Sequence, residues 1–114
     1  MTADDFRLIA LGFPEATESA HMGHPDFRVS GKIFATLWTD GAWGVVLLKP
    51  EEQARLLASD PTVFVPAKGG WGTKGGTQVR LEAAPEKMVR RALGMAWQRI
   101  APRKLVAESG LTFH

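Results

Sequence analysis

The chain has 114 residues and a mass of 12.4 kDa, and its 45% hydrophobic and 23% charged residues are typical of one globular domain rather than a disordered or fibrous chain. It contains no cysteine, which excludes disulfides, thiol nucleophiles and cysteine-ligated metals. Its formal net charge is +2, yet residues 1–66 hold 5 Lys and Arg against 9 Asp and Glu, whereas residues 67–114 hold 9 against 3. This asymmetry predicts an anionic partner, unless both halves intermix on the surface.

Targeting features are also missing from the sequence. No apolar run approaches the roughly 20 residues that span a bilayer. The first residues, Met1–Asp5, are acidic, which is unlike a secretory or transit signal. Together with the missing cysteines, these features predict a cytoplasmic protein that does not enter a membrane.

The first part of the chain predicts a helix followed by antiparallel strands. Thr2 is a suitable N-cap with Asp5 three residues later, and apolar residues then recur at helical spacing up to Gly12. The turn at Ser30-Gly31 predicts a tight hairpin, and Thr39–Gly41 predicts a type I′ connection. The expected strands are Ala16–Met22, Asp26–Val29, Lys32–Trp38 and Ala42–Leu48. Strict alternation would place Ile33, Ala35 and Leu37 on one face and Phe34, Thr36 and Trp38 on the other.

The second part predicts a short helix, a strand pair around a glycine-rich loop, and a long helix. The long helix begins at Pro85 and ends before Pro102, and an apolar face follows it for three turns. The other expected elements are a helix at Pro50–Ser59, a short strand at Val63–Val65, a loop at residues 66–76, a strand at Thr77–Glu82, a helical turn at residues 103–108 and a frayed end at Leu111–His114. In the strand at Thr77–Glu82, Gln78 should point outward. This order predicts an α+β fold, with a single domain over residues 1–114, a core of residues 1–108 and a tail of residues 109–114.

The glycine-rich loop is the first candidate binding site. Exposed backbone amides, flanking cations and an aromatic plane suit a phosphate or an unstacked base. The candidate residues are Lys68, Gly69, Gly70, Trp71 and Lys74. The loop is not a Walker A motif, because Lys74 is followed by Gly75 and a strand. The alternative is a mobile hairpin loop whose tryptophan packs on the core.

Two further groups of cations are candidate phosphate contacts. Arg28 and Lys32 flank the Ser30-Gly31 turn, and Lys87, Arg90 and Arg91 share the polar face of the last helix. The alternatives are a charged strand edge that prevents aggregation and an ordinary solvated helix face.

The sequence gives little support for a metal site, a cofactor or an enzyme. His21 and His24 are close in sequence, but a catalytic zinc requires three protein ligands, no cysteine is present, and the nearest acid is Asp26. His24-Pro25 is better explained as part of a turn. No serine lies in a nucleophile-elbow motif. We therefore expect no metal, no cofactor and no catalytic activity.

Several ordered blocks resemble the MmcQ/YjbR family over about residues 1–108. They are His24–Ala35, Leu48–Glu51, Phe64–Ala67, Gly69–Gly72 and Ala96-Trp97. The resemblance implies an α+β sheet with helices on one side, similar to the frataxin/CyaY-like architecture and described as a double-wing arrangement. Proteins of this family are commonly labelled DNA-binding, so the resemblance also implies DNA as a partner.

These observations lead to two functional hypotheses. The first is a non-enzymatic domain that binds DNA through phosphate contacts of Arg28, Lys32, Lys68 and Lys74, with stacking on Trp71. The second is a domain that binds a small anionic ligand, or a protein partner, in a pocket at the glycine-rich loop. A convex basic face would favour DNA, and a pocket beside Trp71 would favour the small ligand.

Overall fold

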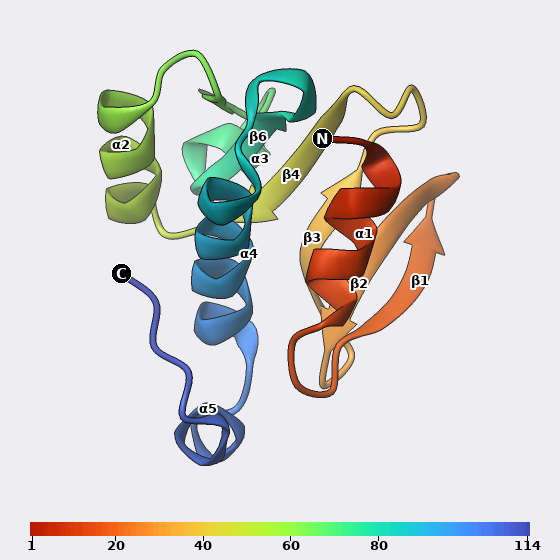
Figure 1. The fold of residues 1–114 in the computed structure, drawn as a ribbon, viewed down its shortest axis with the longest axis vertical. Coiled ribbons are helices and arrows are strands. Elements are labelled where there is room, and N and C mark those ends of the chain that lie inside the picture. Colours follow the sequence, from red (N-terminus) through yellow and green to blue (C-terminus); the bar gives the residue numbers. More distant parts are fainter.

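The structure, a computed structural model, describes residues 1–114 as a six-stranded antiparallel sheet with helices around it (Figure 1). The helices are α1 (Ala3–Leu11), α2 (Pro50–Ser59), α3 (Gly70–Thr73), α4 (Glu86–Ile100) and α5 (Arg103–Ser109), with a 3₁₀ turn at Leu81–Ala83. The strands are β1 (Thr17–His21), β2 (His24–Val29), β3 (Lys32–Leu37), β4 (Trp43–Leu47), β5 (Phe64–Pro66) and β6 (Gly76–Arg80). The expected α+β class is confirmed, as is the helix predicted at Pro50–Ser59.

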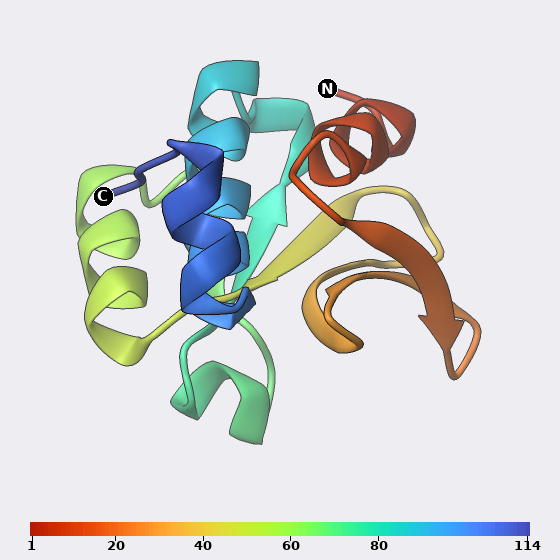
Figure 2. The same cartoon turned by 90° about the horizontal axis from the view of Figure 1, so that it is seen from below.

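The sheet has the strand order β1-β2-β3-β4-β6-β5, in which every neighbouring pair is antiparallel. Helices α1 and α4 lie on one side of it, and the short helix α3 lies on the other side (Figures 1 and 2). Helix α2 packs at the edge formed by β5. One face of the sheet is therefore covered by the long helices, and of the helices only the short α3 lies on the opposite face, which we call the open face.

The hydrophobic core fills the space between the sheet and helices α1 and α4. Trp97 of α4 is fully buried there, stacks on Phe13 with 5.8 Å between ring centroids, and donates its indole N–H to the Pro14 carbonyl at 3.0 Å. Gly44 of β4 lies directly under the Phe6 ring, so a side chain at this position would overlap the ring. The apolar positions predicted for the last helix are buried as expected.

The N-terminal end of α1 forms as the sequence predicted. The Thr2 hydroxyl accepts a hydrogen bond from the Asp5 amide at 3.1 Å, and the Asp5 carboxylate accepts one from the Thr2 amide at 2.9 Å. This reciprocal capping box satisfies two backbone donors that the helix itself leaves unpaired.

The prediction that side chains alternate strictly along β3, with Phe34 on the face opposite Ala35 and Leu37, was wrong at Phe34. The register slips between Phe27 and Arg28 of β2, so that Phe34 has no partner across the ladder. Such a β-bulge adds one residue to a strand and rotates the side chains that follow. As a result Phe34 lies in the core together with Ala35 and Leu37.

Two turns also differ from the sequence-based expectation. At residues 39–41 only Gly41 has a positive φ, of 71°, so the turn is not of type I′, which requires two such residues. Near His24-Pro25 the turn lies one step earlier, at Met22-Gly23, with φ of 49° and 80°. His24 and Pro25 instead begin β2, where Pro25 pairs with Ala20.

The glycine-rich segment, predicted as a loop over residues 66–76, contains regular secondary structure. It contains the single helical turn α3, and the strand after it ends at Arg80 rather than Glu82. Gln78 lies on the face opposite the core, as predicted, but it is only 8% exposed.

The end of the chain packs against α4 instead of fraying. Arg91 donates to the His114 carbonyl at 2.6 Å, and the Gln98 amide side chain makes two hydrogen bonds, each of 3.0 Å, with the Phe113 backbone. The Phe113 ring contacts Phe13 edge-on at 5.6 Å and occupies the space above Gly94. The expected frayed end was therefore wrong, because it considered only local propensity and not this packing.

Candidate ligand-binding site

A cavity of about 430 Å³ lies on the sheet face that the long helices leave open. The β1–β2 turn borders it on one side, strands β3 and β4 form its floor, and the segment that leads into α3 borders the other side. Its lining residues are His21, Met22, His24, Thr36, Trp38, Val45, Ala67, Lys68 and Trp71. The volume is within the usual range for small-molecule sites.

Aromatic side chains dominate the wall of this cavity. Trp38 and Trp71 are 37% and 43% exposed, and each lies near a histidine. The His24 ring meets the Trp38 ring edge-on at 5.0 Å, and the His21 and Trp71 ring centroids are 6.1 Å apart. The two histidine rings are also 6.1 Å apart, because His21 and His24 pair directly across the hairpin. The cavity thus offers several ring faces to a planar ligand.

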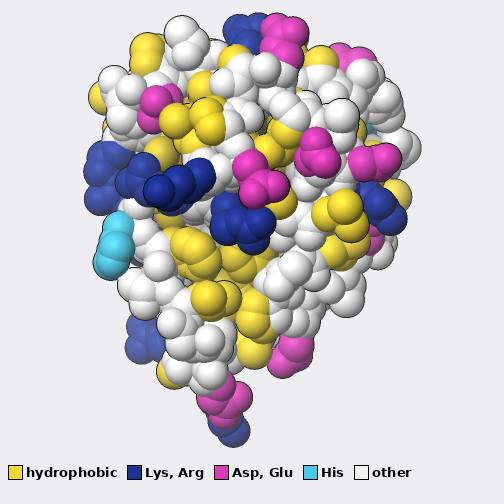
Figure 3. Space-filling view, viewed as in Figure 1, with side chains coloured by type: hydrophobic (Ala, Val, Ile, Leu, Met, Phe, Trp, Pro, Cys, Tyr) yellow, Lys and Arg dark blue, Asp and Glu magenta, His cyan; other side chains and the backbone are white.

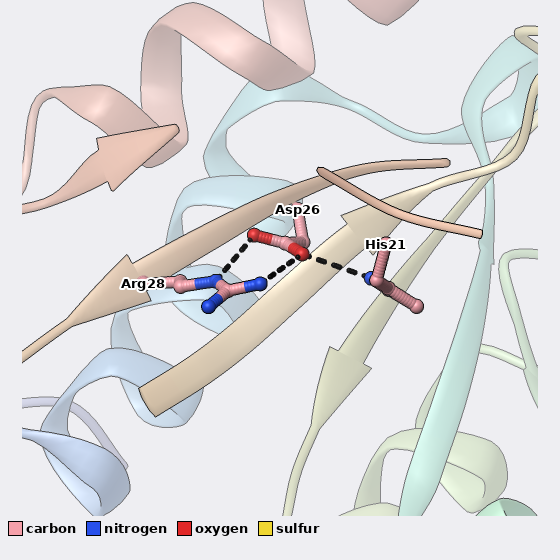
Figure 4. Close-up of polar contacts among 3 residues, drawn as sticks. All are labelled: His21, Asp26 and Arg28. Carbon is pink, nitrogen blue, oxygen red and sulfur yellow. Dashed lines mark hydrogen bonds and ion pairs between the residues drawn. The ribbon is translucent and has the colours of Figure 1, made fainter. Parts of the chain in front are cut away.

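A buried carboxylate organises the histidine side of the cavity. The Asp26 side chain is fully buried; it accepts two hydrogen bonds from the Arg28 guanidinium, at 2.8 and 2.9 Å, and contacts His21 Nδ1 at 2.9 Å (Figure 4). These bonds, chiefly those from Arg28, hold the pKa of Asp26 below its ordinary value of 3.8, although burial opposes the shift. The same pair raises the pKa of Arg28. At neutral pH Asp26 is therefore held as an anion that bonds to both neighbours.

His24 contributes an unpaired polar atom to the same region. Its Nδ1 is enclosed and has no hydrogen-bond partner in the protein. Buried polar atoms in proteins are nearly always paired, and those that are not are often found at functional sites.

The glycine-rich segment is fixed by contacts that require glycine. The Gln53 side chain of α2 donates to the carbonyls of Gly72 and Gly76, at 3.0 and 2.8 Å. A Cβ at Gly72 would overlap the Ala67 carbonyl, and one at Gly75 would overlap the Leu48 carbonyl. Close backbone approach therefore places α3, and with it Trp71, beside the sheet.

The predicted site residues do not form one surface. Lys68 and Trp71 line the cavity, but Lys74 lines a second, smaller cavity of about 250 Å³ that Trp71 and Arg99 also border. Gly69 and Gly70 precede Trp71 in the segment, and both are exposed. Lys32 lies at the opposite end of the β2–β3 hairpin from His24.

The predicted basic faces are partly neutralised by their own neighbours. Arg28 is paired with Asp26, Arg90 is 3.8 Å from Glu86, and Arg91 is bound to the end of the chain. On the helix-covered side of the molecule, Lys and Arg side chains gather beside the C-terminal end, with acidic and hydrophobic groups among them (Figure 3). The second half of the sequence thus does not build a single cationic face there.

Sequence reasoning missed most of the cavity wall. It considered His21 and His24 as metal ligands, and His24 also as part of a turn, and it did not consider Trp38 as a site residue. A weak signal was present, since Gly23 suits one of the two positive-φ positions of the turn at Met22-Gly23, which pairs the histidines on either side of it. The Asp26–Arg28 pair, being two residues apart on one strand, also had a readable spacing.

The comparisons with known proteins agree with this architecture. The YjbR family model matches residues 11–99, which include the whole sheet and both sides of the cavity. The chain belongs to the YjbR family. The crystal structure of a Deinococcus radiodurans protein with the family-model domain DUF419 is similar to this YjbR chain, with a TM-score of 0.75 and 18% identity over 97% of this chain and 89% of the other. No match was found among curated proteins.

These results confirm the resemblance drawn from the sequence and the fold it implied. At 18% identity the Deinococcus structure supports the fold alone. No helix of this YjbR chain is both long and apolar enough to cross a membrane. The function must be argued from the cavity itself.

Proposed function

We propose that this YjbR-family protein binds a small planar ligand with a negatively charged group in the cavity between Trp38 and Trp71. The supporting observation is the cavity itself, which gathers two partly exposed tryptophans, two histidines and a lysine in one concavity of about 430 Å³. Exposed tryptophans in a concave site are costly to leave in water and favourable to cover with another ring.

The charge expected of the ligand comes from Lys68. This lysine lines the cavity, and it forms no ion pair within the chain. An unpaired ammonium beside aromatic rings favours an aromatic carboxylate, sulfonate or phosphate over a neutral ring of the same shape. In this proposal the protein acts by binding, without converting its ligand, and does so in the cytoplasm.

A binding screen tests the proposal directly. Intrinsic tryptophan fluorescence and thermal shift would be measured against mononucleotides, aromatic carboxylates and phosphorylated aliphatic metabolites. We expect the aromatic anions to quench the fluorescence and raise the melting temperature, and the aliphatic phosphates to do neither. If no planar anion binds at millimolar concentration, the proposal is wrong.

Matched variants locate the site. Trp71→Ala should weaken binding by about 5- to 150-fold, since a ring contact of this kind contributes on the order of 1–3 kcal/mol. Leu8→Ala, which removes an exposed apolar side chain of α1 on the other side of the sheet, should leave binding unchanged. Lys68→Gln should weaken the binding of anions only, with Lys104→Gln of α5 as its control.

DNA binding remains a second candidate, because Lys32, Lys68 and Lys74 form no ion pairs within the chain. An unstacked base of a single strand would fit the same cavity that we propose for a planar ligand. Fluorescence anisotropy with single-stranded and duplex DNA across a salt series tests this. Phosphate contacts would give an affinity that falls steeply with salt. Absence of binding at low salt would exclude it.

A further inference from the structure

We propose that His21 is a second anion-binding group of this cavity, beside Lys68, and that the ligand is bound together with one proton, which His21 takes up. The inference rests on the proposed function, and it specifies which atom receives the ligand's charged group. It follows from how Asp26 holds the histidine ring, from the free nitrogen that remains, and from the other charges around it.

The first step is the orientation of the ring. The buried Asp26 carboxylate lies 2.9 Å from His21 Nδ1, so this nitrogen bears a proton and donates it to the carboxylate. The ring extends from this bond away from Asp26 (Figure 4). The second nitrogen, Nε2, makes no hydrogen bond within the protein, and His21 lines the cavity. Nε2 is therefore the nitrogen available to a ligand.

The second step is the state of Nε2. In the neutral ring the proton is on Nδ1, so Nε2 presents a lone pair, which repels an anionic oxygen. In the protonated ring Nε2 becomes a donor with a positive charge, and Asp26 stabilises that charge from the other side of the ring. An anionic ligand thus selects the protonated form, and by linkage its binding raises the proton affinity of the ring.

The third step is the set of charges that surround His21. Asp26 and Arg28 of β2 form an ion pair whose charges largely cancel, and Lys68 adds a cation at the cavity wall. His24 faces His21 across the hairpin with an enclosed, unpaired Nδ1. In the empty cavity Lys68 opposes a further positive charge on His21. A bound anion offsets the Lys68 charge and so removes this opposition. Anion binding and protonation of His21 are therefore coupled.

The experiment compares two probes of the same shape. 2-Naphthoate has a carboxylate that stays ionised between about pH 5.5 and about pH 8, and 2-naphthamide is neutral throughout. Binding of each probe to the full chain would be measured by tryptophan fluorescence across this range. We expect 2-naphthoate affinity to rise as the pH falls, by up to about tenfold per pH unit, the limit for uptake of one proton. The affinity of 2-naphthamide should stay constant.

Variants assign the proton to one histidine. His21→Gln should abolish the pH dependence of 2-naphthoate binding while 2-naphthamide still binds, which also shows that the variant is folded. His24→Gln should retain the pH dependence. His114→Gln, which changes the third histidine of the chain, at its exposed end, is the matched control and should behave as the parent.

The outcomes separate this inference from the proposed function. If 2-naphthoate binds with an affinity that is constant or falls as the pH is lowered, the inference is wrong and the proposed function stands. If the pH dependence survives His21→Gln and disappears in His24→Gln, the assignment to His21 is wrong. If neither probe binds the parent chain, the proposed function itself fails.

Discussion

The two faces of the sheet hold the tryptophans in different ways. The face covered by α1 and α4 holds one, Trp97, which is fully buried and fully hydrogen-bonded. The open face and the α3 segment beside it hold the other three, and all of them retain exposed surface. Of these, Trp43 lies under the Arg80 guanidinium at 4.5 Å, whereas Trp38 and Trp71 border the cavity.

The difference indicates that the two faces have separate roles. The helix-covered face has the apolar, tightly packed composition that a domain of this size needs for stability. The open face has aromatic rings, histidines and a partly buried ion pair, which folding alone does not require. Substitutions on the first face should therefore change stability, and substitutions around the cavity should change binding.

The largest expected effect is the loss of stability when the buried Trp97 is replaced. Trp97→Ala should lower the free energy of unfolding by about 3–5 kcal/mol, because it leaves a large cavity against Phe13. Trp71→Ala, with its partly exposed ring, should cost under about 1 kcal/mol. Urea denaturation followed by circular dichroism measures both. Comparable losses in the two variants would contradict the division between the faces.

The next largest effect is expected when a closely packed glycine of the glycine-rich segment is replaced. Gly72→Ala should cost about 1–3 kcal/mol and weaken ligand binding, since the added Cβ overlaps the Ala67 carbonyl and displaces α3. Gly70→Ala is the matched control: a Cβ there meets nothing within 4 Å, so stability should change by less than about 0.5 kcal/mol. Thermal unfolding and the fluorescence titration would test the pair. Equal behaviour of the two variants would show that close packing does not position Trp71.

A smaller effect is expected at the end of the chain, which packs beside the core face. Phe113→Ala should lower stability by about 1–2 kcal/mol, because the half-buried ring covers Gly94 and contacts Phe13. Ligand binding should not change, as this end lies on the helix side of the sheet. Leu111→Ala, at a more exposed position, is the control for general effects of the tail. If Phe113→Ala also weakened ligand binding, the two faces of the sheet would not have the separate roles described above.

The smallest effect concerns the acid stability contributed by Asp26. The pKa of Asp26 is lowered in the folded protein, so its carboxylate stabilises the fold above about pH 3.8, the ordinary pKa of an aspartate. This contribution is lost as the pH falls through the lower pKa of the folded state. The stability difference between the parent and Asp26→Asn should therefore shrink as the pH is lowered below about 4. Asp5→Asn serves as a comparison, since the pKa of Asp5 is lowered by Thr2 in the exposed capping box. A difference that stays constant with pH would mean that Asp26 is not held as an anion.

Local sequence patterns predicted much of the fold. The capping box at Thr2, the apolar face of α4 and the start of α2 at Pro50 depend on neighbours within one or two turns, and all were found. The bulge at Phe34 was missed because it depends on the register between β2 and β3, which the sequence of one strand does not show. The packing of Phe113 was missed because it depends on a space above Gly94, far away in the sequence.

The site was only partly predictable for the same reason. Lys68 and Trp71 stood out by residue type in a glycine-rich segment, and both line the cavity. His21 and His24 lie on one hairpin and Trp38 follows β3, so the three acquire a common role only when this hairpin and β3 pair. The charge asymmetry between the halves was less informative, since Arg28, Arg90 and Arg91 have partners within the chain.

The central claim, that the cavity beside Trp71 binds planar anions, is most directly tested by nuclear magnetic resonance of the four tryptophan indole N–H groups. They would be assigned by single Trp→Phe substitutions and followed during titration with 2-naphthoate. We predict that the signals of Trp38 and Trp71 shift with a common saturable dependence, while the buried Trp97 signal stays in place. Shifts confined to Trp43 or Trp97, or no shift at all, would contradict the claim.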